Sequence, residues 1–262
     1  MSRERITLFP EAERPIVFGH RGYSAQAPEN TLPAFQLLLD HGVPGVELDV
    51  HRCASGELVV IHDHELSRLT GEGGIVEELS LEQLRQRSVG AWFSPEFADE
   101  RAPLLTEVFS LLGDKVYYDI EIKQETRDPT GIEQALARLI DEFGLEARTL
   151  VSSFNPYPVK RFAALETGIP TAVIYSNSKS VPRALRNGQG RFIARCDVLK
   201  PNRRKINPVT RFWYNRVERY PLLTWTVNSE DEVDRLLSLE VDGLISDDPA
   251  MVMKRLSPPE LV

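Results

Sequence analysis

The stretch GVELDVH, residues 45–51, decides the fold of this chain. Apolar and polar residues alternate along it, and this two-residue period is typical of a β-strand. Glu47, Asp49 and His51 therefore share one face of the strand, and the apolar residues share the other. Because two carboxylates at successive positions of one face repel each other, the stretch predicts a compensating positive charge beside that face.

A second stretch, YYDIEIK at residues 117–123, repeats the pattern with Asp119, Glu121 and Lys123 on one face. Short β-branched runs of this kind alternate with longer amphipathic stretches from one end of the chain to the other. This alternation predicts βα units around a parallel sheet.

Eight strand patterns and about eight helix patterns follow one another. The expected strands are Ile16–Gly19, Gly45–His51 with a continuation at Glu57–His62, Val116–Lys123, Thr149–Ser153, Thr171–Tyr175, Ile193–Val198, Leu222–Val227 and Gly243–Ser246. The expected helices are Thr31–His41, Leu105–Leu112, Ile132–Phe143, Pro158–Glu166, Ser180–Arg186, Pro208–Arg219, Glu230–Leu239 and Pro249–Leu256. Eight units in 262 residues predict a single α/β domain, a (β/α)8 TIM barrel over residues 1–262. The first strand is not followed by the Gly-x-Gly-x-x-Gly turn of a dinucleotide-binding fold.

The region at about residues 64–103 does not fit the alternation. It contains no barrel strand and is too long for an ordinary loop. We expect an insertion after the second strand that packs over one end of the barrel, close to His62 and Asp63.

Composition restricts the partners and the compartment. The chain has 31 basic and 39 acidic residues, a formal net charge of −8, so nucleic acid and anionic membrane are not expected as general partners. Cys53 and Cys196 have no metal-ligand spacing and are expected as buried thiols. No apolar run is long enough for a signal or membrane segment, which predicts a cytoplasmic protein without an integral membrane segment. No pattern specifies an oligomeric state.

Three carboxylates are the candidate metal ligands. Barrel active sites lie at the carboxyl ends of the strands, where Glu47, Asp49 and Glu121 would point to one place. An all-oxygen ligand set suits a hard divalent cation, Mg²⁺ or Ca²⁺, better than Zn²⁺. The alternative is an internal ion-pair cluster with Lys123 and Arg21, and the spacing leaves both interpretations open.

The five histidines have different positions in this pattern. His20 and His62 each end an expected strand beside a charged neighbour, where an acid/base pair would stand, although a structural histidine fits either position as well. His41 lies at a helix end and is expected as a cap. His51 and His64 are ambiguous, and His51 faces inward as possible support for the carboxylates. The spacing of His62 and His64 also occurs in amidohydrolases, but there it belongs to the first strand.

Six blocks in this order resemble the glycerophosphodiester phosphodiesterase family. They are HRG at 20–22, PENT at 28–31 followed by Ala34 and Phe35, ELDV at 47–50, VVIHD at 59–63, EIK at 121–123 and WTVN at 225–228. The resemblance continues through VGAWF at 89–93 and PLLTEV at 103–108 to VDGLISD at 241–247. It covers nearly the whole chain except the region from about residue 175 to 216.

The resemblance implies a function and roles for named residues. It implies a metal-dependent enzyme that hydrolyses small-molecule glycerophosphodiesters to sn-glycerol 3-phosphate and an alcohol. Glu47, Asp49 and Glu121 would hold one divalent cation, Mg²⁺ or Ca²⁺. His20 and His62 would be the catalytic acid/base pair, and Arg21 and Lys123 would hold the phosphate.

Other residues and functions stay open at this stage. Trp225 fits packing against the glycerol carbons of the substrate or a place in the core. Ser152, Ser153 and Lys200 stand near strand ends within reach of a substrate oxygen, and a basic stretch at about residues 183–205 fits either a solvated surface or a rim that attracts anions. The rival functions are a related barrel phosphodiesterase acting on a lysophospholipid or phosphoinositide, and a catalytically silent barrel that binds phosphodiesters.

Overall fold

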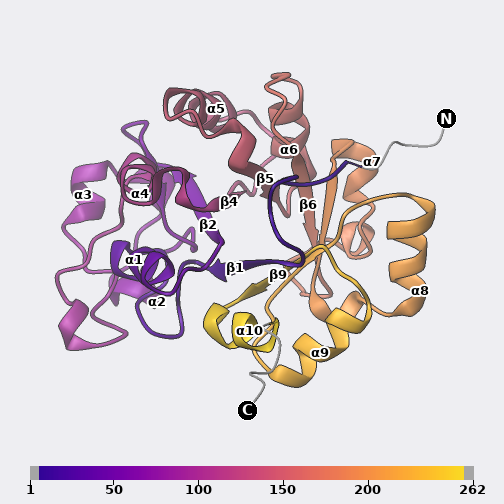
Figure 1. The fold of residues 1–262 in the computed structure, drawn as a ribbon. Coiled ribbons are helices and arrows are strands. Elements are labelled where there is room, and N and C mark those ends of the chain that lie inside the picture. The colour runs from indigo at the N-terminus through magenta and orange to yellow at the C-terminus, as the bar shows by residue number, and fades with distance from the viewer. Residues whose placement is uncertain (1–5, 257–262) are drawn as a thin grey trace, which may run out of the picture.

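Eight parallel strands form a barrel in the part of the chain that the computed structural model describes, residues 6–256 (Figure 1). Their hydrogen-bonded order is β7-β6-β5-β4-β2-β1-β9-β8. Isolated bridges from Leu199 to Leu222 and from Asn202 to Trp225 bring β7 beside β8 and nearly close the ring. The barrel strands are β1 Ile16–His20, β2 Gly45–Arg52, β4 Tyr117–Ile122, β5 Thr149–Ser153, β6 Thr171–Tyr175, β7 Val198–Pro201, β8 Leu223–Thr224 and β9 Gly243–Ser246. The predicted (β/α)8 barrel is confirmed.

The ends of the expected domain, residues 1–5 and 257–262, lie outside the described residues. Between residues 6 and 256, no helix combines the length and the apolar character needed to cross a membrane.

Helices surround the strands (Figure 1). They are α1 Leu32–Asp40, α4 Leu105–Leu112, α5 Ile132–Glu142, α6 Pro156–Ala163, α7 Gly190–Ala194, α8 Pro208–Arg211, α9 Glu230–Ser238 and α10 Pro249–Leu256. Several begin at a residue whose side chain accepts a backbone hydrogen bond, as Thr31 does before α1 and Ser229 before α9. The helix expected over residues 208–219 is instead the short α8 followed by a π-helical segment, η7 Phe212–Val217.

Two layers fill the barrel interior. The inner residues nearer the amino ends of the strands are apolar and include Phe18, Leu150, Val198 and Ile245. Side chains two residues apart on a strand share a face, so the residue two positions further along each strand also points inward. These next inward residues are polar, as with His20 on β1. The apolar layer thus supports a polar layer at the carboxyl ends.

The second strand does not continue as a barrel strand at Glu57–His62. After Arg52 the chain turns back, and β3 Leu58–Val60 pairs antiparallel with β2. The following segment contains α2 Ser67–Thr70, η1 Val76–Glu78, α3 Leu81–Arg85 and η2 Pro95–Phe97. It has a core of its own that includes Cys53, Leu69, Val76 and Leu84. This insertion lies beside β2 and α1 in Figure 1.

Candidate active site

The cleft at the carboxyl ends of the strands has a volume of about 1350 Å³. Asp49 lies just beneath its surface, with 1% of the residue exposed. The other seven residues singled out from the sequence line the cleft: His20, Arg21, Glu47, His62, Glu121, Lys123 and Trp225. The fold therefore brings all eight to one place.

Glu47, Asp49 and Glu121 form an acidic cluster, the acidic triad. One carboxylate oxygen of each lies within 4.8 Å of the others. The register of β2 and β4 sets Asp49 opposite Glu121, and Glu47 lies two residues earlier on the same face. All three residues are buried. The triad offers only oxygen donors, which is the ligand set that Mg²⁺ and Ca²⁺ prefer.

Two of the cations expected from the sequence lie against the triad. The Nζ of Lys123 is 2.9 Å from Glu121 and 3.6 Å from Asp49. The Nε of Arg21 is 3.5 Å from Asp49. The ion-pair cluster and the oxygen ligand set, which the sequence left as alternatives, are therefore present together.

Lys200 on β7 forms the floor of the cleft. Its buried Nζ is 2.7 Å from Asp119, 3.1 Å from the hydroxyl of Ser152 and 3.6 Å from Glu47. Burial lowers the pKa of Lys200, but the charges of Asp119 and Glu47 outweigh burial and hold that pKa above its ordinary value. Lys200 therefore stays charged and supports the triad from below.

The surroundings act differently on the carboxylates of the triad. Burial raises the pKa of Glu47 to about 6, although the charge of Lys200 opposes this shift. Burial also raises the pKa of Asp49, but the charges of His62 and Lys123 outweigh burial and hold it below its usual range. The three buried carboxylates offer oxygens close enough together to share one ion, so the residues present fit a divalent cation.

His20 and His62 each have a carboxylate partner. The Nδ1 of His20 is 2.6 Å from Asp247, and the Nδ1 of His62 is 2.5 Å from Asp63. A carboxylate at Nδ1 fixes the orientation and tautomer of an imidazole and leaves Nε2 for proton transfer. The Nε2 of His20 lies 4.0 Å from Glu47, at the edge of the triad. Both rings are thus oriented for acid–base chemistry beside the triad.

An ionic network fixes Arg21 and reaches the insertion. Arg21 donates to Glu29 at 2.8 Å, and Glu29 also accepts from Arg68 of α2 at 2.6 Å. Arg68 in turn donates to Asp63, the partner of His62. The Nε of Arg21 is buried and faces Asp49 at 3.5 Å, so the guanidinium links this network to the triad.

The later half of the barrel supplies one wall of the cleft. The indole N–H of Trp225 donates to the carbonyl of Lys200 at 3.1 Å, and its ring meets Phe154 edge to face with centroids 5.5 Å apart. These contacts fix the ring while it still lines the cleft. The ring is thus packed and also lines the cleft, and its contact with a substrate stays a prediction.

The basic stretch at residues 183–205 contributes to the cleft only in part. Arg204 and Lys205 line the cleft, as an anion-attracting rim requires. Arg191 is buried in a two-pronged ion pair with Glu218, so it fits neither a solvated surface nor the rim.

The other three histidines have separate surroundings. His41 is the C-cap residue of α1, as expected. His51 does not support the triad, because β2 leaves the barrel beyond Asp49 and carries His51 to Glu77 in the insertion. His64 contacts the same Glu77.

The sequence model of the glycerophosphoryl diester phosphodiesterase family matches residues 20–251. The chain belongs to this family. The motif blocks quoted from the sequence therefore indicated the correct family.

Individual relatives agree with this assignment. A glycerophosphodiester phosphodiesterase of Caldanaerobacter subterraneus subsp. tengcongensis is 36% identical over 241 residues, which cover 90% of this chain and 95% of the relative. Another, from Bacillus altitudinis, is 31% identical over 248 residues, 91% of this chain and 96% of the relative. A solved structure of an Oleispira antarctica phosphodiesterase, in complex with the product sn-glycerol-3-phosphate, matches with a TM-score of 0.77 and 27% identity, over 92% of this chain and 96% of that chain.

Sequence reasoning missed four residues that support the site of this family member. Asn30 donates to Asp49 at 2.9 Å, and Asp63, Arg68 and Asp247 orient other site residues. Asn30, Asp63 and Asp247 lie inside the motif blocks, which was a signal for them. Arg68 lies in the insertion, where no motif pointed to it.

Proposed function

We propose that this protein hydrolyses glycerophosphodiesters to sn-glycerol 3-phosphate and an alcohol. The observation that carries the proposal is the pair of histidines beside the acidic triad, His20 and His62, each held at Nδ1 by a carboxylate. A barrel that only binds phosphodiesters has no need of two imidazoles oriented in this way. The product complex of the Oleispira relative supports the same substrate class.

The phosphate would lie between the triad and the cations that border it. Arg21 offers the guanidinium that lies against Asp49, and Lys123 offers an ammonium that lies against Asp49 and Glu121. Burial lowers the pKa of Lys123, but the charges of Glu121 and Asp49 outweigh burial and raise it. Both side chains therefore present full positive charge to the phosphoryl oxygens.

Glu47, Asp49 and Glu121 would hold Mg²⁺ or Ca²⁺ in this proposal. When bound there, the ion supplies neutralisation of the charge that spreads over the phosphoryl oxygens. Hydrogen bonding from Asn30 orients Asp49 for this role.

The two histidines would move the protons. In the first step the neighbouring glycerol hydroxyl oxygen attacks phosphorus, and the Nε2 of one histidine accepts the hydroxyl proton. As the bond from phosphorus to the alcohol oxygen breaks, the other histidine donates a proton to that oxygen, which leaves a cyclic phosphate. In the second step a water oxygen attacks phosphorus, and the histidine that had donated a proton accepts one from this water. As the ring opens, the other histidine returns its proton to the glycerol oxygen. The step restores both histidines.

The proposed partner is a small molecule in aqueous solution. With a net charge of −8, the chain has no general attraction for nucleic acid. Trp225 and Phe154 offer an aromatic wall for the carbon atoms of the glycerol or of the leaving alcohol. The cytoplasmic location stays a prediction.

A phosphorus NMR assay tests the proposal. The protein with Mg²⁺ or Ca²⁺ is incubated with glycerophosphocholine, glycerophosphoethanolamine and a lysophospholipid in separate reactions. We expect the glycerophosphodiesters to yield the sn-glycerol 3-phosphate signal, and the double variant His20→Ala/His62→Ala to yield none. Cleavage of the lysophospholipid alone would support the rival phosphodiesterase, and binding without cleavage of any diester would support the silent barrel.

A further inference from the structure

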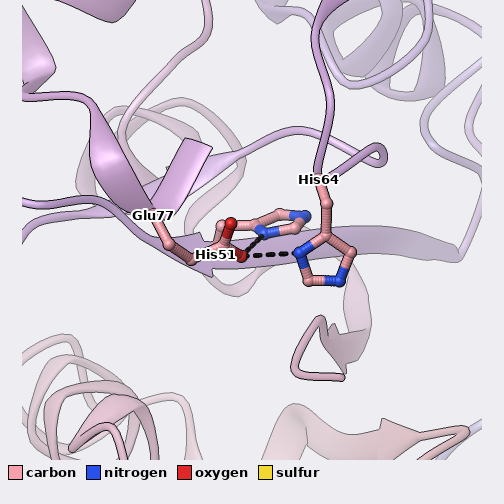
Figure 2. A group of neighbouring side chains, drawn as sticks. All are labelled: His51, His64 and Glu77. Carbon is pink, nitrogen blue, oxygen red and sulfur yellow. Dashed lines mark hydrogen bonds and ion pairs between the residues drawn. The ribbon is translucent and has the colours of Figure 1, made fainter. Parts of the chain in front are cut away.

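A second group of metal-ligating side chains lies outside the acidic triad: His51 on β2, His64 after β3, and Glu77 on η1. We call it the histidine cluster. The Nδ1 atoms of both histidines converge on one oxygen of Glu77, at 2.6 Å from His51 and 2.8 Å from His64 (Figure 2). The two rings meet edge to face with centroids 4.7 Å apart. The proposed reaction uses none of these three side chains.

The buried ring of His51 has an oxygen at each nitrogen. The Nε2 lies 3.2 Å from the carbonyl oxygen of His62, and the Nδ1 lies 2.6 Å from Glu77. A neutral imidazole carries one proton, so it donates to only one of these two oxygens. A metal ion at Nδ1 would leave the Nε2–H to donate to His62.

We propose that the histidine cluster binds a divalent transition-metal ion of the Zn²⁺ class, at a site distinct from the acidic triad. Two imidazole nitrogens and one carboxylate suit such an ion, whereas the all-oxygen triad suits Mg²⁺ or Ca²⁺. In known sites a ligating histidine donates its other N–H to a carbonyl or a carboxylate. With the ion on Nδ1 of His51, its Nε2–H would donate to the carbonyl of His62, which lies 3.2 Å away.

The cluster is partly exposed. The side chains of His64 and Glu77 are 26% and 33% exposed, so the cluster is open to ions from the solvent on that side. Metal bonds of about 2.0–2.2 Å at tetrahedral angles separate ligand atoms by about 3.3–3.5 Å. The carboxylate of Glu77 therefore moves outward by less than about 1 Å on binding, and its partial exposure permits this movement.

The ion would connect the insertion to the backbone of the acid–base residue. Glu77 belongs to the insertion, and His51 bonds the carbonyl of His62. Occupancy should therefore raise the thermal midpoint of the protein and protect the insertion from proteolysis.

Equilibrium dialysis of untagged, chelator-stripped protein against Zn²⁺, with excess Mg²⁺ to occupy the triad, tests the proposal. We expect one tightly bound Zn²⁺ per chain in the wild type. His64→Gln and Glu77→Gln, which change partly exposed side chains, should each weaken binding at least tenfold. The matched controls His41→Gln, a histidine at the end of α1, and Asp49→Asn, a triad carboxylate, should keep wild-type affinity for Zn²⁺.

Substitution by Co²⁺ gives a second readout, because a four-coordinate nitrogen–oxygen site produces intense visible absorption that is lost in the two cluster variants. Thermal unfolding with Mg²⁺ alone verifies that the variants fold. If wild-type protein retains no Zn²⁺, or if His64→Gln and Glu77→Gln bind it as tightly as His41→Gln, the histidine cluster is an ion pair held by a proton and the proposal is wrong. Diester hydrolysis does not enter either result.

Discussion

The first and later halves of the barrel contribute different things to the cleft. The half from β1 to β4 supplies the acidic triad, both histidines of the acid–base pair and the two cations proposed to hold phosphate. The half from β5 to β9 supplies Lys200 on the floor, Asp247 behind His20, and the wall that contains Trp225. The charges proposed to act on phosphorus are thus concentrated on one side, and the surface proposed to contact the rest of the substrate lies on the other.

The two halves also differ in how firmly their strands are paired. β2 has 8 residues and β4 has 6, and they pair in register from Gly45 to Val50. β7 has 4 residues, β8 has 2, and they meet only through isolated bridges in the described chain. Longer pairing holds the mutually repelling carboxylates in place. The wall has no such requirement, so its shape is free to suit a particular alcohol.

Loss of the divalent cation, which the first half of the barrel would hold, should reduce turnover more than any other change. Chelation, or Asp49→Asn or Glu121→Gln, should reduce turnover of glycerophosphocholine by at least about 10²-fold, because the charge on the phosphoryl oxygens is then uncompensated. Added Mg²⁺ or Ca²⁺ should restore the chelated wild type. The exposed Asp114→Asn, before β4, is the matched control. Full turnover in exhaustively chelated protein would show that the reaction needs no metal.

Asp247→Asn tests whether this residue of the later half contributes to catalysis through His20. We expect kcat to fall about 10–100-fold, since His20 loses the carboxylate that orients it. The pH dependence of kcat should change as well, whereas the exposed Asp231→Asn on α9 should leave both unchanged. An unchanged pH profile would mean that Asp247 is only structural.

Changes in the wall should act mainly on substrate binding. Trp225→Ala should raise KM about fivefold, corresponding to about 1 kcal/mol of lost contact, with little change in kcat. Arg204→Ala should raise KM at low ionic strength and have less effect at high salt, because exposed charges are screened. Arg183→Ala, which lies outside the cleft lining, is the control. If kcat fell in Trp225→Ala as much as in a triad variant, the proposed difference in role between the two halves would be wrong.

Acid titration should give the smallest difference between variants. Burial raises the pKa of Asp63 and of Asp247, but hydrogen bonds, first from His62 and His20 respectively, outweigh burial and lower both values. A lowered folded pKa stabilises the protein above about pH 4 and loses that contribution as pH falls through the folded value. Urea midpoints between pH 5 and 3 should therefore fall less steeply in Asp247→Asn than in the wild type. Parallel curves would contradict this.

Much of the fold followed from the two-residue period of the strands. The limits of β5, β6 and β9 are those expected, and inward carboxylates of β2 and β4 form the triad. The strand expected at Ile193–Val198 was wrong: residues 190–194 form α7, and β7 begins at Val198. A short apolar run does not distinguish a buried helix turn from a strand.

Contacts between distant segments of the chain could not be read from periodicity. Asp247 reaches His20 only because β9 pairs with β1. The direction of His51 depends on the turn after Arg52, which reverses the chain into β3 and places His51 beside Glu77. Both outcomes depend on tertiary pairing, which single-strand patterns do not contain.

Leaving-group dependence in the two histidine variants tests the central claim most directly. His20→Ala and His62→Ala should each lower kcat for glycerophosphocholine about 10²–10⁴-fold. With a glycerophosphoryl nitrophenyl ester, whose leaving group needs no proton, activity should recover in only one variant, the one that lacks the general acid. Equal loss on both substrates in both variants, or wild-type turnover in either, would contradict the assignment of an acid and a base on one phosphorus.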